Sequence, residues 1–255
     1  MSWRKVQLVG LWLCIFLPLG ASTVPQAVNE PQAANEKDAV RTMMVPGAGG
    51  QPGYTLRISV SGREGRVEVR NHLGAMTQTL TCPLLQDEAN PSDLEVKGAA
   101  KEFVSRFEMK DLDLDGYLDL RGVREYGAKW ARYCVWLFHP KTPMFSRSDP
   151  LAQQMESLYN LAVDPKRSLI ISYSIGPVNP LVDEYRIERV GKDRPYWPRL
   201  VPVQSCFLEN DSPHAGETDP GDWIVVRVRY DHEHPVVVRR PQRSGLCSED
   251  LGKGW

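Results

Sequence analysis

The stretch Asp111-Leu112-Asp113-Leu114-Asp115-Gly116-Tyr117-Leu118-Asp119 organises what the sequence predicts about the whole chain. It places four carboxylates at positions 1, 3, 5 and 9 of a short loop, and a glycine at position 6. Carboxylates this close repel one another, and a bound cation removes the repulsion. Calcium is the best fit, because it takes about six to eight oxygen ligands in flexible geometry. The spacing therefore predicts a Ca²⁺ site with ligands from the side chains of Asp111, Asp113, Asp115 and Asp119 and from the backbone carbonyl of Tyr117.

This loop is not a complete EF-hand. Position 12, where a bidentate glutamate is expected, holds Gly122, and the nearest later acid is Glu125. A missing bidentate ligand favours a weak or purely structural site, as in extracellular modules. The alternative is a solvated acidic turn that holds no metal.

The residues before the loop fit two kinds of element. Ala99, Phe103 and Phe107 are four residues apart, as on one face of a helix, whereas the residues from Phe103 to Met109 also alternate as in a strand. We favour the strand, because glycines after the loop weaken a following helix. The sequence thus predicts a strand–loop–strand calcium site.

Outward from the loop, apolar and polar residues alternate in many short segments separated by Gly/Pro turns. The predicted strands are 54–60, 66–70, 76–82, 133–138, 168–173, 184–190, 223–230 and 236–238, with one short helix around 152–159. Residues 86–93, 174–182 and 195–202 are expected to be loops or turns. The predicted fold class is all-β, a single antiparallel β domain spanning residues 54–240, with sandwich, barrel and small propeller-like arrangements all open.

The N-terminal segment has the features of a secretory signal peptide. A short basic region, Arg4 and Lys5, precedes an apolar run that ends in small residues, so residues 1–21 are expected to be cleaved. The alternative is an uncleaved anchor, for which the apolar run is short. Residues 22–53 are rich in Pro, Gly and Ala and are predicted to form a flexible linker, and residues 241–255 a polar C-terminal tail. We therefore expect a periplasmic protein with no stable membrane insertion after cleavage.

Four cysteines remain after cleavage, and an even number in an exported protein favours two disulfides. Three pairings are possible. The simplest pins the tail through Cys206 and Cys247, which leaves Cys82 to pair with Cys134. No CxxC spacing is present, so a zinc site is not expected.

The composition and the motifs narrow the class of function. The 255-residue chain has a net charge of −1, so neither a nucleic acid nor an anionic membrane is an expected partner. No set of residues resembles a catalytic nucleophile with its base, so we do not predict an enzyme. A hydrolase with its own pair of carboxylates is kept as an alternative.

One loop stands out as a candidate partner-binding element. It follows the strand that ends at Tyr173 and precedes the strand that starts at Glu184. Loops on a stiff scaffold often carry binding residues, and tyrosine is a frequent anchor at interfaces. The alternative is a plain connecting loop.

The segment Phe107–Leu120 resembles the strand-plus-calcium-loop signature of bacterial periplasmic immunity proteins that neutralise peptidoglycan-hydrolase effectors of a type IV secretion system. Those proteins are similar in fold to invertebrate-type lysozyme inhibitors. The order of the later segments also fits: Trp136–Pro140, Leu158–Pro165, Ile170–Ser174 and a return strand with Tyr185. The resemblance covers about residues 54 to 200.

The resemblance implies a compact antiparallel β fold, structural Ca²⁺ and an inhibitory hairpin that plugs the active-site groove of a lysozyme-like enzyme. The hairpin residues would be Tyr173, Ser174, Gly176 and Tyr185. The expected function is thus an exported, calcium-stabilised inhibitor or immunity protein whose partner is a peptidoglycan hydrolase. The alternative is a structural or scaffold β module of the cell envelope with no enzyme target.

Overall fold

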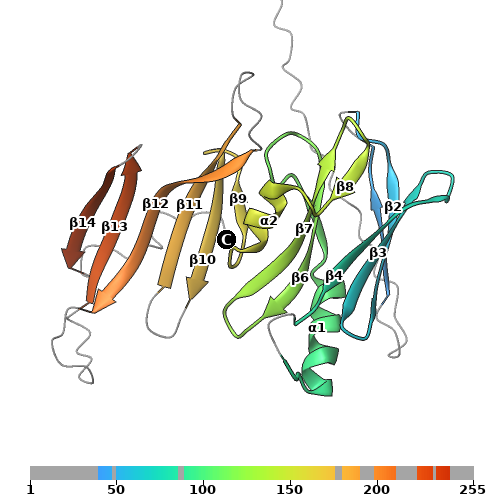
Figure 1. Cartoon of the computed structure of the whole chain (residues 1–255), viewed down its shortest axis with the longest axis horizontal. Helices are drawn as coiled ribbons and strands as arrows, with labels where there is room; N and C mark the ends of the chain where they lie inside the picture. The colour runs from blue at the N-terminus through green and yellow to red at the C-terminus, as the bar shows by residue number, and fades with distance from the viewer. Residues whose placement is uncertain are drawn as a thin grey trace, which may run out of the picture.

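The computed structural model describes residues 40–47, 50–85, 89–175, 180–189, 198–210, 223–231 and 234–241 (Figure 1). These residues form strands and two short helices in the following order: β1 (Arg41–Val45), β2 (Tyr54–Ser61), β3 (Glu64–Asn71), β4 (Met76–Pro83), α1 (Asp93–Ser105), β5 (Glu108–Lys110), β6 (Asp119–Tyr126), β7 (Ala131–His139), β8 (Met144–Ser146), α2 (Pro150–Glu156), β9 (Ala162–Asp164), β10 (Leu169–Ile175), β11 (Pro180–Glu188), β12 (Arg199–Asn210), β13 (Trp223–Asp231) and β14 (His234–Pro241). Within the described ranges, no helix is long and apolar enough to cross a membrane.

The strands form three antiparallel sheets, each made of strands that are consecutive in the chain. The first sheet has the order β1-β2-β3-β4, the second β5-β6-β7-β8, and the third β9 to β14. Figure 1 shows the three sheets side by side, with α1 below the first two and α2 between the second and the third. The antiparallel β architecture is confirmed, but the all-β class is corrected to a mostly-β fold with two helices.

The middle sheet is buried on both faces. One face packs with the first sheet and α1 in a core that includes Leu120, Trp136 and Phe138. The other face packs with α2 and the start of the third sheet in a second core that includes Val123 and Val135. Successive strand residues point to opposite faces, so a strand between two cores needs apolar side chains at nearly every position. This explains the unbroken apolar and aromatic run of β7.

The predicted flexible linker, residues 22–53, is wrong for its C-terminal part. β1 pairs with β2 from Arg41↔Ile58 to Val45↔Tyr54, and Met43 and Val45 are buried in the first core. Arg41 Nη1 donates to the carbonyls of Val104 and Ser105, which lie at the open C-terminal end of α1. A strand with only two inward apolar side chains gives a weak signal in the sequence. The Pro and Gly residues around it favoured the prediction of a flexible linker instead.

The strand favoured for residues 103–109 is wrong over its first half. α1 continues to Ser105 and buries Ala99 and Phe103, and only β5 is extended before the acidic loop. A capping box marks the start of this helix: Glu95 N donates to Ser92 Oγ, and Ser92 N donates to a carboxylate oxygen of Glu95. The Ser-x-x-Glu spacing was the available signal for the helix.

Two strand boundaries were predicted wrongly because the strands contain prolines. Residues 195–202 were expected to be a turn, but β12 begins at Arg199 and includes Pro202. The register between β11 and β12 shifts next to Tyr185, the partner of Pro202, and such an irregularity tolerates the missing N–H of proline. Similarly, β11 begins at Pro180 rather than at Glu184, because proline is allowed as the first residue of a strand.

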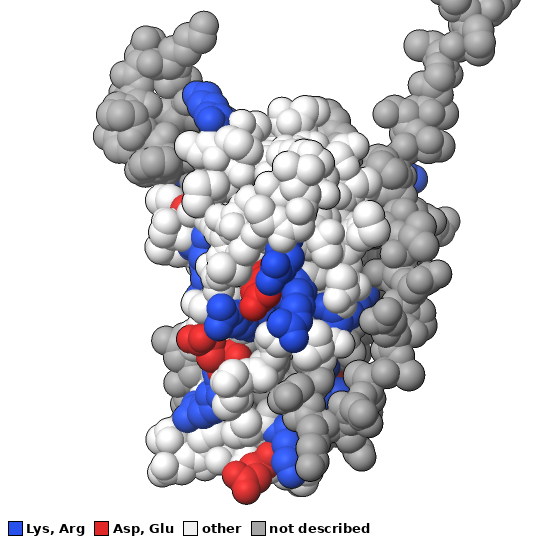
Figure 2. Space-filling view, turned by 90° about the vertical axis from the view of Figure 1, so that its right-hand side faces the viewer, with Lys and Arg blue, Asp and Glu red and all other residues white. Residues whose placement is uncertain are grey.

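The outer face of the first sheet is polar and faces the viewer in Figure 2, where basic side chains surround acidic ones. The Glu68 carboxylate of β3 lies within 3.9 Å of three guanidinium groups, those of Arg57, Arg66 and Arg70. These cations, with the hydrogen bond from Arg70 as the largest cause, lower the pKa of Glu68. The alternation of this face with the buried face explains the period-two pattern of β2 and β3.

Candidate functional site

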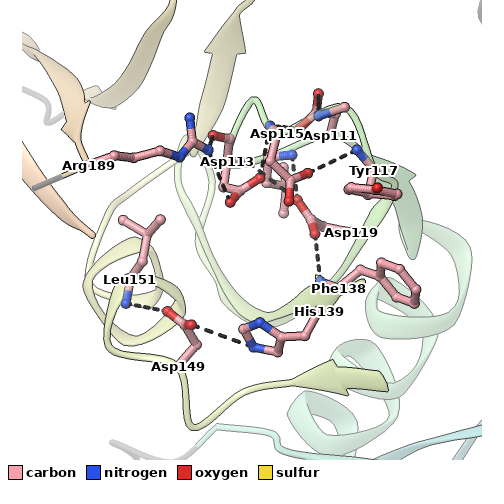
Figure 3. Close-up of polar contacts among 12 residues, drawn as sticks. Asp111, Asp113, Asp115, Tyr117, Asp119, Phe138, His139, Asp149, Leu151 and Arg189 are labelled. Atoms are coloured by element: carbon pink, nitrogen blue, oxygen red, sulfur yellow. Dashed lines mark hydrogen bonds and ion pairs between the residues drawn. The ribbon is translucent and has the colours of Figure 1, made fainter. Parts of the chain in front are cut away.

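The acidic loop connects β5 to β6, as the strand–loop–strand prediction requires. Lys110 pairs with Asp119 and Met109 pairs with Leu120, so the two ends of the loop are joined by a ladder. The carboxylates of Asp111, Asp113 and Asp115 each offer one oxygen, and these three oxygens lie within 4.8 Å of one another. Figure 3 shows the three side chains turned toward a common point. This acidic triad is able to hold a metal ion.

Backbone N–H groups hold the triad in place. Asp115 N and Gly116 N donate to the two carboxylate oxygens of Asp111 at 3.1 and 3.0 Å, and Tyr117 N donates to Asp115 Oδ1 at 2.9 Å. Gly116 has a φ of 92°, which a residue with a Cβ rarely adopts, and this allows the loop to reverse direction. The sequence therefore folds the loop around its own carboxylates.

The environment of Asp119 differs from that of the other three carboxylates. It is fully buried, and its Oδ2 accepts from Leu112 N at 2.8 Å and from Asp113 N at 3.3 Å. Its Oδ1 accepts from Phe138 N of β7 at 2.8 Å. Asp119 thus anchors the loop to the centre of the middle sheet, and its predicted role as a ligand stays a prediction.

The remaining neighbours fix the loop from outside. The Tyr117 ring packs on Phe138, with ring centroids 5.6 Å apart, so the side chain points away from the acidic triad and only its carbonyl remains as the predicted ligand. Gln51 exchanges two hydrogen bonds of 2.9 Å with the backbone of Leu118. Arg189, just after β11, donates to the carbonyl of Asp113 at 2.6 Å. The loop therefore joins all three sheets.

Burial and mutual repulsion disfavour the charged forms of these carboxylates. Burial, followed by the nearby Asp115 carboxylate, raises the pKa of Asp113 to about 7, although Arg189 opposes the shift. Burial also raises the pKa of Asp111 and, together with the Asp113 charge, the pKa of Asp119. A cation at the triad would remove the repulsion that these shifts reflect.

This repulsion predicts how the stability of the metal-free chain depends on pH. Because the folded-state pKa of Asp113 is about 7 and its ordinary value is 3.8, the folded state binds more protons than the unfolded state between these values. The free energy of unfolding in chelator should therefore fall as the pH rises from about 5 to about 8. Urea unfolding across this range measures the slope, and Asp113→Asn is the control that should flatten it. A slope of the opposite sign, or one unchanged by Asp113→Asn, would contradict the prediction.

The glycine at position 12 of the loop is explained by packing. A Cβ on Gly122 would lie 2.5 Å from Cε2 of Phe103 and 3.0 Å from Cδ2 of Phe107. The same Phe103 ring covers Gly65 of β3, where a Cβ would lie 2.6 Å from Cζ. The ring of Phe103 is thus sandwiched between two glycines, and no acid fits at position 122.

We expect Gly122→Ala to lower the free energy of unfolding by about 2 kcal/mol, because the Phe103 ring has to move in a packed core. Urea denaturation measures the change. A cycle with Phe103→Leu isolates the cause: in this background, which lacks the aromatic ring, Gly122→Ala should cost less than in the wild type. Equal costs in both backgrounds would show that the contact with Phe103 is not responsible.

The predicted inhibitory hairpin, called the contact hairpin below, is formed by β10 and β11. Tyr173 pairs with Val182 and Ser174 with Leu181, both near the turn, while Gly176 lies outside the described residues. Tyr185 pairs with Ile170, further from the turn, and packs against the second core. Burial, followed by the Asp183 carboxylate, raises the pKa of Tyr185 to about 12. The structure thus brings Tyr173 and Ser174 together near the turn but not Tyr185.

Tyr173 also lines a pocket of about 420 Å³ that sequence reasoning missed. The other lining residues come from the end of α1, from the β6–β7 turn and from the segment before β9: Arg106, Gly127, Ala128, Lys129, Trp130 and Asn160. No spacing in the sequence joins these segments. The available signal was a tryptophan in a short turn, where a large apolar side chain is unusual.

The predicted Cys82–Cys134 disulfide is confirmed, and it joins β4 of the first sheet to β7 of the second. Cys206 is also disulfide-bonded, and its predicted partner, Cys247, lies outside the described residues. Disulfides persist mainly in oxidising compartments, so the covalent structure favours a location outside the cytoplasm. The predicted signal peptide, residues 1–21, and the tail from residue 242 lie outside the described residues as well.

Comparisons with protein-family models, with curated proteins and with solved structures found no match to this chain.

Proposed function

We propose that this chain is an exported, calcium-stabilised inhibitor that acts as an immunity protein and occludes the active site of a peptidoglycan hydrolase of the lysozyme type. The observation that carries the proposal is the placement of Tyr173 and Ser174 near the turn of the β10–β11 hairpin. Both strands are flanked by further strands of the third sheet, β9 on one side and β12 on the other. Binding residues on such a stiff support lose little entropy when a partner binds.

In this proposal, Ca²⁺ binds the triad of Asp111, Asp113 and Asp115 and acts as a structural staple. The loop that it would lock contacts Gln51, in the connection between β1 and β2, and Arg189, the residue that follows β11. Calcium would then restrain β11, one of the two strands of the contact hairpin. The ion takes no part in a reaction, because the inhibitor works by occlusion.

The expected location is the periplasm. The predicted signal peptide and the disulfide-bonded cysteines support export. Calcium is also abundant enough outside the cytoplasm to fill a site that lacks a glutamate at position 12.

The test is an inhibition assay against a panel of peptidoglycan hydrolases, lysozymes included, in the presence of Ca²⁺. Loss of turbidity of purified peptidoglycan reports turnover. We expect inhibition of at least one enzyme near equimolar ratio. The variant Tyr173→Ala/Ser174→Ala should weaken inhibition at least tenfold, which is about 1.4 kcal/mol.

Tyr230→Ala is the matched control, since Tyr230 is a tyrosine of the third sheet that lies on β13 rather than on the hairpin. It should leave inhibition unchanged. No inhibition across the panel would contradict the proposed function. Full potency of the double variant would contradict the role of the hairpin.

A specific observation favours a second candidate, an assembly or scaffold module of the envelope. Among the described strands, β14 pairs with β13 alone, and its Val236 and Val237 are exposed at 53% and 49%. An edge strand with exposed valines on both faces is a template for pairing with another strand. Sedimentation of the purified chain tests this candidate, which predicts an oligomer that Val237→Lys disperses.

A further inference from the structure

The pocket beside the contact hairpin has a lining whose chemistry selects a class of ligand. Two cations, Arg106 and Lys129, share it with the rings of Trp130 and Tyr173. The described lining residues include no Asp or Glu. The pocket's volume of about 420 Å³ lies in the range typical of small-ligand sites. We infer that this pocket binds a carboxylate-bearing sugar ring, the acidic unit of a glycan.

The two cations of the pocket are the reason to expect a carboxylate on the ligand. Arg106 follows α1, and its guanidinium forms a solvent-accessible ion pair with the Glu102 carboxylate at 3.3 Å. Exposed pairs of this kind contribute little, so a ligand carboxylate can take the place of Glu102 at small cost. A guanidinium binds a planar carboxylate through two parallel hydrogen bonds, and the Lys129 ammonium adds a second positive charge.

The aromatic side chains of the pocket are the reason to expect a sugar ring in the ligand. Trp130 is 36% exposed, and its indole meets the Tyr159 ring edge to face at a centroid distance of 5.7 Å. Tyr159 in turn lies beneath the guanidinium of Arg132. An indole held in this way combines an apolar surface with a polar N–H, which suits a ligand with one apolar face and several hydroxyl groups.

The pocket is built on fixed backbone. Gly127 N donates to the Trp130 carbonyl at 2.8 Å, which closes the β6–β7 turn. Asn160 accepts from Ala131 N at 2.9 Å and donates to the carbonyls of Lys129 and Tyr173 at 3.0 and 2.9 Å. The side chain of Asn160 therefore locks the turn to β10, so the walls of the pocket are preorganised and little ordering accompanies binding.

The test is an NMR titration of the full mature chain in Ca²⁺, with the Trp130 indole N–H as the reporter. Trp130→Phe assigns this signal. The probes are N-acetylmuramic acid, galacturonic acid and N-acetylglucosamine, the last of which lacks a carboxylate. We expect saturable shifts of the Trp130 signal with at least one acid and at least fivefold weaker binding of N-acetylglucosamine. The acid that binds better identifies the source of the glycan, a muramyl or a uronic one.

Arg106→Gln and Lys129→Gln should each weaken binding of the acid at least threefold, whereas Arg66→Gln, on the outer face of the first sheet, should not. Thermal melting shows that each variant is folded. Equal binding of acidic and neutral sugars, no saturable shift at millimolar concentration, or an equal effect of Arg66→Gln would overturn the inference. The inference does not rest on the proposed inhibition, because the titration contains no hydrolase.

Discussion

Asp119→Ala should lower the free energy of unfolding by about 3 kcal/mol or more. The carboxylate of Asp119 accepts hydrogen bonds from Leu112 N, Asp113 N and Phe138 N, and the residue is fully buried. Alanine would leave these buried N–H groups without their acceptor, and each such loss costs about 1–3 kcal/mol. Relief of the unfavourable burial of this carboxyl group near Asp113 offsets part of this cost. Urea unfolding in chelator, where the predicted role of Asp119 as a metal ligand does not contribute, measures the net change.

Two variants separate the anchoring role of Asp119 from its charge. Asp119→Asn keeps one carbonyl acceptor and should cost less than Asp119→Ala. Asp115→Ala removes an exposed carboxylate from the same loop and should change the metal-free stability by less than about 1 kcal/mol. If Asp119→Ala cost no more than Asp115→Ala in chelator, the anchoring role would be refuted.

Cys82→Ala/Cys134→Ala should lower the free energy of unfolding by about 4 kcal/mol. The disulfide closes a loop between residues 52 positions apart, and the chain-entropy model gives about this value for such a loop. Both cysteines are fully buried in the first core, so lost packing adds to the effect. Guanidinium unfolding of the oxidised protein gives the change.

Substitution is preferable to reduction here, because reduction would also break the disulfide of Cys206. The single variant Cys206→Ala removes only the other disulfide and leaves Cys82–Cys134 intact, so it measures the contribution of that second disulfide separately. A loss smaller than about 1 kcal/mol for the double variant would mean that the bridge between the first two sheets adds little to stability.

Local patterns predicted the parts of the fold that depend on neighbouring residues. Alternation in β2 and β3 predicted the first hairpin, and the spacing of Asp111, Asp113 and Asp115 predicted an acidic cluster on a strand–loop–strand element. The Cys82–Cys134 pairing was one of three possibilities, and only the packing of the first sheet on the second decides it.

The features that the sequence did not predict depend on contacts between segments that are distant in the chain. Gln51 lies in the predicted linker, yet it binds the backbone of Leu118, 67 residues later. Asp119 lies at a sequence position typical of a metal ligand. Its carboxylate, however, accepts a hydrogen bond from Phe138 N of β7, and this contact depends on how the strands pack. The pocket around Trp130 draws on four separate segments, so no local pattern contains it.

The central claim is that the acidic loop is a calcium staple for the three sheets, and calorimetric unfolding of the mature chain with Ca²⁺ and with chelator tests it most directly. We predict a higher unfolding temperature in Ca²⁺ that rises with its concentration, as expected for an ion that binds only the folded state. Asp111→Asn/Asp113→Asn should abolish the increase, while Asp164→Asn, a partly exposed acid outside the loop, should preserve it. An unfolding temperature that is the same in Ca²⁺ and in chelator would contradict the account.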